Sequence, residues 1–158
     1  MGMDLYSKRG DEYYRFNWSG WSNVCNFLSS RGCDLSEFAG SNDGDVVPAK
    51  SCKAIADTLD KLRARLTELM TCPGKDLLTH TNEDPVLVTE YKDDREIEVD
   101  IIKAIIDTRL KSGKKMNPKK ILDADRDPWD VWARLGYYLD FGTDFCRKCS
   151  KLGGFKQC

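Results

Sequence analysis

The sequence predicts a mainly α (α+β) fold: a single compact helical domain over residues 1–158, with three to four main helices and a small antiparallel β element near the N-terminus. Apolar residues recur at helical spacing in several long segments, whereas the N-terminal residues form two short aromatic runs around a polar turn. A chain of 158 residues is also long enough to bury a core of its own.

Two short strands are predicted at residues 4–6 and 13–16, because apolar and aromatic pieces there flank the polar turn Ser7–Asp11. Asn17 or Ser19 is expected to cap the helix that follows, since either side chain can accept a hydrogen bond from a free N–H of the first helical turn.

That first helix is predicted to run to about Ser30 and to end at Gly32, with a further short helical turn at Leu35–Phe38. Its buried face is expected to contain Trp21, Val24, Cys25 and Leu28.

The clearest helical pattern opens at Val47 and Pro48 and runs to about Met70, with its apolar residues on one stripe and its charged residues on the other faces. The segment 72–74 ends it, because proline cannot continue the helical hydrogen bonds. In the polar region beyond, Val86–Tyr91 is predicted to be an edge strand or part of an excursion loop.

A second long helix is predicted at Glu96–Lys111, followed by the basic loop Lys111–Lys120. A final helix is predicted from a cap at Asp127 to a stop at Gly153-Gly154, with Gly142 as a weak point. Its apolar stripe contains Trp132, Leu135, Leu139 and Phe145.

The charge balance limits the classes of partner. With 25 basic and 26 acidic side chains, no overall field attracts nucleic acid or an anionic membrane, so nucleic acid is not an expected partner. No apolar run is long enough to span a bilayer, and a membrane role is not expected either. The predicted location is the cytoplasm, where seven unevenly spaced cysteines do not indicate a disulfide framework.

The Cys146-x2-Cys149 pair with Cys158 is the first candidate for chemistry, because closely spaced thiolates can share a zinc ion. The second short-spaced pair of a usual zinc site is missing, so no cofactor is the favoured prediction and structural zinc is the alternative. A redox role is less favoured still, because the pair lies near a helix C-terminus, where the dipole disfavours thiolate.

No catalytic constellation stands out elsewhere, and the protein is predicted not to be an enzyme. His80, the one histidine, has no sequence-near nucleophile to activate. The acidic run 123–127 lacks the glycine and glutamate of a calcium loop, and Asp43 and Asp45 fit a turn better than a catalytic pair.

A set of aromatic, cationic and amide side chains near the N-terminus is the candidate binding site, with Asn42 and Asp43 from the later turn. Such side chains hold planar or phosphorylated ligands and form protein hot spots. The alternative, favoured for any individual residue, is that the aromatic rings belong to the core and the cations lie at its rim. The set comprises Tyr6, Lys8, Arg9, Tyr13, Tyr14, Arg15, Asn17, Trp18 and Trp21.

Several short motifs resemble those of a family of small uncharacterised proteins encoded by phages and prophages. The resemblance covers both ends of the chain and the first helical region, but not residues 75–120. It is carried by Met1–Tyr6, Tyr14–Asn17, Asn42-Asp43-Gly44, Phe145-Cys146-Arg147 and Gly153-Gly154-Phe155.

The resemblance implies an origin in a phage or mobile element and no established catalytic residues. The expected function is therefore that of an accessory protein that binds a host protein stoichiometrically in the host cytoplasm, for example to inhibit an antiphage defence system. One alternative is sequestration of a small nucleotide-like ligand by the N-terminal set, and another is a small zinc-binding structural protein. The oligomeric state is not predicted.

Overall fold

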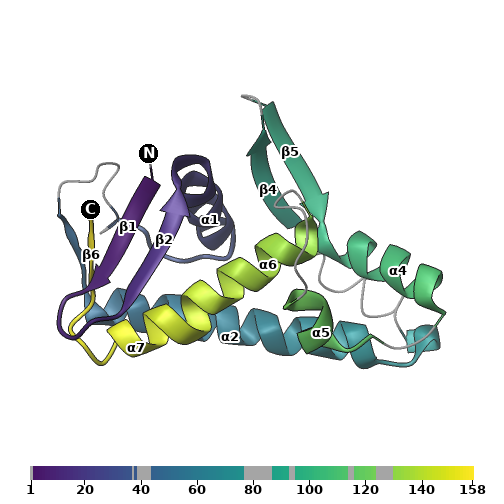
Figure 1. Ribbon diagram of the computed structural model, residues 1–158. Coiled ribbons are helices and arrows are strands. Elements are labelled where there is room, and N and C mark those ends of the chain that lie inside the picture. Colours follow the sequence, from purple (N-terminus) through teal and green to yellow (C-terminus); the bar gives the residue numbers. More distant parts are fainter. Residues whose placement is uncertain are drawn as a thin grey trace. The chain divides into compact units, whose positions relative to one another are not determined.

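The computed structural model describes residues 2–36, 38, 44–76, 87–92, 95–113, 116–123 and 130–158, with the backbone alone at 87–92, 95–100 and 102 (Figure 1). The chain forms two compact units, Met1–Asp60 with Tyr138–Cys158, and Lys61–Tyr137. The prediction of a mainly α fold with a small antiparallel β element at the N-terminus is confirmed. That the two units constitute one domain stays a prediction.

A four-stranded antiparallel sheet organises the first unit, and it joins the two ends of the chain (Figure 1). The predicted N-terminal strands pair as expected, and the last strand then pairs with the first, with Leu5 opposite Gln157. The strand order is β2 (Tyr13–Asn17), β1 (Gly2–Ser7), β6 (Phe155–Gln157) and β3 (Val46–Val47).

One face of this sheet packs into an aromatic core. The rings of Phe16 and Phe141 lie 5.2 Å apart, and those of Phe145 and Phe155 lie 5.5 Å apart. Phe141 and Phe145 belong to η1 (Phe141–Cys146), a π-helical segment that continues α6 (Val131–Asp140) and leads into α7 (Arg147–Cys149). The inner face of the sheet is thereby anchored on the C-terminal helical segment.

The low helix propensity of Gly142 predicts a weak point in the helix, but close packing requires a glycine at this position. An added Cβ there would overlap the side chain of Leu59, so the absence of a side chain lets η1 approach α2 (Ala49–Thr71) closely. The predicted stop at Gly153-Gly154 is confirmed, with φ of +84° and +101°.

The first helix, α1 (Trp18–Ser30), begins as predicted, and Asn17 rather than Ser19 provides the cap. The backbone N–H of Gly20 donates to Asn17 Oδ1 at 2.6 Å. Gly32, with φ of +81°, follows the helix C-terminus. Near the expected turn at residues 35–38, the N–H of Phe38 donates to Leu35 O at 2.9 Å.

The second unit contains a correction to the predicted helix at Glu96–Lys111. Residues Arg95–Asp100 form strand β5, and the helix begins only at Ile101. The sequence from Arg95 to Asp100 alternates polar and β-branched residues, a period of two that favours an extended strand. The strand predicted at residues 86–91 is present as β4, which pairs with β5 as an antiparallel hairpin.

Besides the β4–β5 hairpin, the second unit contains helices. At the start of α6, the side chain of Asp130 accepts a hydrogen bond from the backbone N–H of Trp132 at 2.8 Å. The predicted cap residue, Asp127, lies outside the described residues. The described ranges contain no helix that is long and apolar enough to cross a bilayer. The bounds are β4 (Leu87–Lys92), β5 (Arg95–Asp100), α4 (Ile101–Ser112) and α5 (Pro118–Leu122).

Arg109 of α4 caps the C-terminal end of α2 within the second unit. Its guanidinium donates to Leu69 O at 2.9 Å and to Cys72 O at 2.6 Å. These are carbonyls that a helix end leaves without intrahelical partners, and a cation there also complements the helix dipole.

Replacing Arg109 with Gln is therefore expected to lower the free energy of unfolding by about 2 kcal/mol, because the α2 carbonyls lose charged donors. Lys111→Gln, which removes an exposed cation from the last turn of the same helix, is the matched control. Urea denaturation checks the difference, and equal stability of the two variants would refute the capping role.

The closing turn gives a second prediction. Gly154 combines a positive φ with a backbone neighbour, Val47 O, that an added Cβ would overlap. Gly154→Ala is expected to lower the free energy of unfolding by about 3 kcal/mol. Gly32→Ala shares the positive φ but meets nothing within 4 Å, and it should cost only about 1 kcal/mol in urea denaturation. Similar losses for both would show that the approach of Gly154 to β3 is unimportant.

Candidate functional site

The sheet divides the N-terminal candidate residues between its two faces. Successive side chains of a strand point to opposite faces, and burial follows this alternation in β1 and β2. Leu5 and Phe16 are buried, whereas Tyr6 and Arg15, their neighbours in sequence, are exposed. The N-terminal set therefore supplies both core and surface.

We define the outer sheet face by six residues on the side opposite the aromatic core. One cross-strand row contains four of them, because Tyr6 lies opposite Tyr13 in β2 and opposite Lys156 in β6, which in turn lies opposite Val46. All four are exposed, the two tyrosines by 46% and 48%. The face comprises Tyr13, Tyr6, Lys156 and Val46, with Arg15 and Asp4 in the next row.

The two tyrosines form a pair across β1 and β2. Their ring centroids lie 5.1 Å apart with a tilt of 43°. The hydroxyl of Tyr13 donates to Asp4, and this hydrogen bond raises the pKa of Tyr13 above its ordinary value of 10.0. Asp4 also lies 3.6 Å from Arg15 Nε, so a single carboxylate orients an aromatic and a cationic side chain.

Lys8 and Arg9 extend this surface into the turn after β1. The backbone N–H of Lys8 donates to Gly154 O at 2.8 Å, which holds the turn against the closing glycines. A Cβ placed on Gly153 would lie 3.5 Å from Lys8 Cδ and from Arg9 Nε, so both side chains run over that glycine. Both residues are exposed.

Other predicted site residues lie elsewhere. Tyr14 packs with its ring 5.6 Å from Phe141 and 5.7 Å from Phe145, and Trp21 is 5% exposed and stacks on Phe38 at 5.4 Å. Both therefore contribute to the core.

Two further members of the set lie at the start of α1, and two lie outside the described residues. The side chain of Asn17 is used as the helix cap, while Trp18 is 47% exposed. Asn42 and Asp43 lie outside the described residues, as does His80.

Sequence reasoning did not include Lys156 and Val46 in the candidate site. A three-residue strand and a two-residue strand are too short to show alternation, and their place on the outer sheet face follows only from pairing with β1 and with each other. The available signal for Lys156 was its position between Phe155 and Gln157: the structure buries these two neighbours and exposes the cation between them.

The three cysteines considered for zinc do not share one environment. Cys146 and Cys149 are buried, whereas Cys158 is exposed beside the outer sheet face, where its backbone bonds with Asp4 at 2.8 and 2.9 Å. Burial raises the pKa of Cys149 to about 12, and that of Cys146 well above its usual value, so both favour the neutral thiol. Among the described residues, no three His, Cys, Asp or Glu side chains are grouped as metal ligands.

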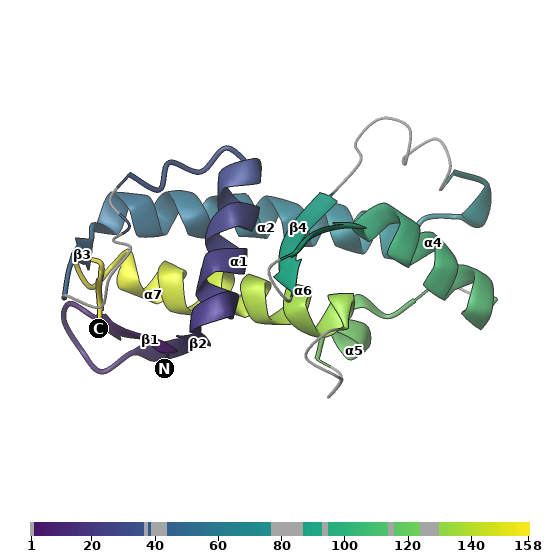
Figure 2. The ribbon, with the colours of Figure 1, turned by 90° about the horizontal axis from the view of Figure 1, so that it is seen from above.

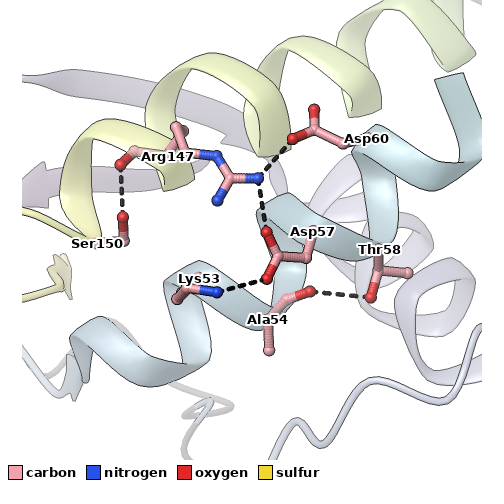
Figure 3. A network of polar contacts seen from close by, with 7 residues as sticks. All are labelled: Lys53, Ala54, Asp57, Thr58, Asp60, Arg147 and Ser150. Carbon is pink, nitrogen blue, oxygen red and sulfur yellow. Dashed lines mark hydrogen bonds and ion pairs between the residues drawn. The ribbon is translucent and has the colours of Figure 1, made fainter. Parts of the chain in front are cut away.

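Figure 3 shows a cluster of charged side chains on α2 and α7. Such side chains also occur in active sites, but here they pair with one another and link the two helices, and we call the cluster the clamp. Arg147 of α7 binds Asp57 at 2.8 Å and also binds Asp60, while Lys53 binds Asp57 at 2.9 Å. Each charge in this cluster thus has an opposite partner one helix away or one turn away. The cluster ties α7 to α2 beneath the sheet.

Comparisons with protein-family models, with curated proteins and with solved structures found no match to this chain. The assignment of a function consequently depends on the geometry of the described residues.

The clamp predicts a pH dependence of stability. Hydrogen bonds from Lys53 and then from Arg147 hold the pKa of Asp57 below its ordinary value of 3.8. Because the folded-state pKa is the lower one, the contribution of Asp57 to stability is present above pH 3.8 and is lost as pH falls through the folded-state pKa.

Wild type is therefore expected to be more stable than Asp57→Asn at about pH 7, with the difference shrinking towards about pH 3. Urea denaturation across this range measures it, and Asp107→Asn, which removes an exposed carboxylate of α4, is the control. A difference that stays constant down to the acid end would contradict the clamp.

Proposed function

We propose that this protein is a stoichiometric binding protein that docks on another protein through its outer sheet face. The observation that carries the proposal is the pair Tyr6 and Tyr13, two half-exposed rings held side by side on a sheet whose other face is packed. Tyrosine and arginine are enriched among the residues that dominate binding energy at protein interfaces, and Arg15 lies in the adjacent row.

The face is preorganised, which lowers the entropy lost on binding. Tyr13 is held by Asp4, and β1 is paired on both sides, with β2 and with β6. Aromatic side chains have few rotatable bonds, and a rigid strand fixes their direction, so little freedom remains to be lost when a partner covers them. These features support a protein interface.

The resemblance to phage and prophage proteins directs the proposal to a host protein in the host cytoplasm, such as a component of an antiphage defence system. The motifs that carry the resemblance coincide in part with the elements that build the face. Met1–Tyr6 covers most of β1, and Gly153-Gly154-Phe155 leads into β6. The proposed mechanism is inhibition or redirection of that host protein by occupancy, without chemistry.

Binding of a small nucleotide-like ligand by the whole N-terminal set stays a prediction. To bind such a ligand, the protein must place its aromatic and cationic side chains around one site. Tyr14 and Trp21 point to the core, while Tyr6 and Arg15 lie on the outer sheet face. The two groups of side chains are therefore not gathered, which favours the protein partner over the small ligand.

Affinity capture from a host lysate with quantitative mass spectrometry tests the proposal. Wild type should recover a specific partner near one-to-one stoichiometry, and the double variant Tyr6→Ser/Tyr13→Ser should recover at least about tenfold less, because truncating two hot-spot rings typically costs more than 1 kcal/mol each. Tyr137→Ser, at a tyrosine of α6 that is 43% exposed, is the matched control.

Thermal unfolding of each variant should first show that the fold is retained. Recovery of the same partner by wild type and by the double variant would contradict docking on the outer sheet face. Recovery of no partner by any form, together with stabilisation by added nucleotides in a thermal-shift assay, would instead favour the small-ligand alternative.

A further inference from the structure

The cations beside the tyrosine pair differ from Arg147 and Lys148 of the same unit. Arg147 and Lys148 are neutralised within the fold, and Lys148 lies 3.2 Å from Glu12 and 3.3 Å from Asp144. Lys8, Arg9 and Lys156, in contrast, are exposed and make no ion pair with the described residues. Positive charge is thus left uncompensated at one end of the outer sheet face.

Among the residues that the structure describes, the acidic groups nearby do not remove this excess. Asp4 is engaged by Tyr13 and Arg15, and Glu12 by Lys148. Asp11, exposed in the same turn, offsets one charge of the three.

Asp45 precedes Val46, and its carbonyl accepts a hydrogen bond from Gln157 N. Asp45 is exposed, and the residue opposite it is therefore Gln157, whereas Val46 lies opposite Lys156.

The sheet register holds these cations close together. Lys156 lies opposite Tyr6, and Lys8, the first residue after β1, donates its backbone N–H to Gly154 O at 2.8 Å, two residues before Lys156. Diagonal neighbours of this kind are about 7–8 Å apart. That separation is comparable with the Debye length of about 8 Å at physiological salt, so the repulsion is only partly screened and an acidic partner relieves it.

We infer that the occupant of the outer sheet face is an acidic segment of a partner protein, with carboxylates opposite Lys8, Arg9 and Lys156 and apolar or aromatic side chains against Tyr6 and Tyr13. This inference rests on the proposed function and specifies the chemistry of the partner. Electrostatic complementarity of this kind selects the partner and accelerates its association.

The same face is less suited to single-stranded nucleic acid. Base stacking uses open ring faces, whereas the two tyrosine rings pack against each other at 5.1 Å. Asp4 contacts both Tyr13 and Arg15, and its carboxylate would repel a phosphate group placed beside them. A protein segment can instead place separate carboxylates only where cations face them.

Fluorescence anisotropy with labelled peptides of about twelve residues tests the inference. The probes are a peptide of alternating glutamate and tyrosine, a peptide of alternating lysine and tyrosine, and an oligothymidylate of similar length. The full-length protein is expected to bind the glutamate peptide at least about tenfold more tightly than either other probe, and to lose affinity several-fold between about 50 mM and about 300 mM sodium chloride.

The charge-reversal variant Lys8→Glu/Arg9→Glu/Lys156→Glu should bind the glutamate peptide about tenfold more weakly than wild type. The control variant Lys111→Glu/Lys119→Glu/Lys120→Glu changes the net charge equally, at exposed lysines of the second unit, and should bind as wild type does. Equal weakening in both variants would overturn the inference, because it would show a general charge effect.

Failure of the glutamate peptide to bind, or tighter binding of the oligothymidylate, would also overturn it. These outcomes remain distinct from failure of the proposed function. If Tyr6→Ser/Tyr13→Ser still abolishes capture of a partner from lysate, docking on the outer sheet face stands and only the acidic character of the segment is wrong.

Discussion

The first unit depends on the insertion of β6 between β1 and β3. Three residues suffice, because backbone pairing on both sides is reinforced by burial of Phe155 among Phe38, Phe141 and Phe145. Gly154 makes the insertion sterically feasible beside Val47. Without this strand, β3 would lose its place in the sheet, and Lys156 would no longer lie next to Tyr6. The surface proposed for binding is therefore a product of the same contact that closes the core.

The aromatic residues illustrate how one sheet serves two purposes. Phe16 and Tyr14 stack into the core against η1, and this packing fixes the strand on which Tyr13 and Arg15 are displayed to solvent. Burial supplies most of the energy of aromatic side chains, so the inner rings stabilise the fold while the outer rings remain available to a partner. Arg147 links α7 to α2, which lie side by side (Figures 2 and 3).

Local signals in the sequence predicted much of the fold. The Asn17 cap, the apolar stripe of α2 and the closing glycines each follow from chemistry within a few residues. The strand at Arg95–Asp100 was missed because Val99 continues the helical spacing of Ile102 and Ile105 or Ile106, so the predicted helix was extended back over it. For the site, composition identified the right side chains, but their division between two faces depends on strand register. Pairing of the first and last strands is a long-range property that no local pattern encodes.

The order of synthesis gives the discontinuous first unit a further consequence. Its sheet cannot be completed until Phe155–Gln157 have left the ribosome, whereas Lys61–Tyr137 is continuous in the chain and is synthesised earlier. Phe16 and Tyr14 are therefore synthesised well before Phe141 and Phe145, the residues whose rings they contact in the core. Contacts so distant in sequence slow folding and leave apolar surface exposed meanwhile. The aromatic face of the N-terminal strands is therefore exposed until Phe155–Gln157 can pair with β1.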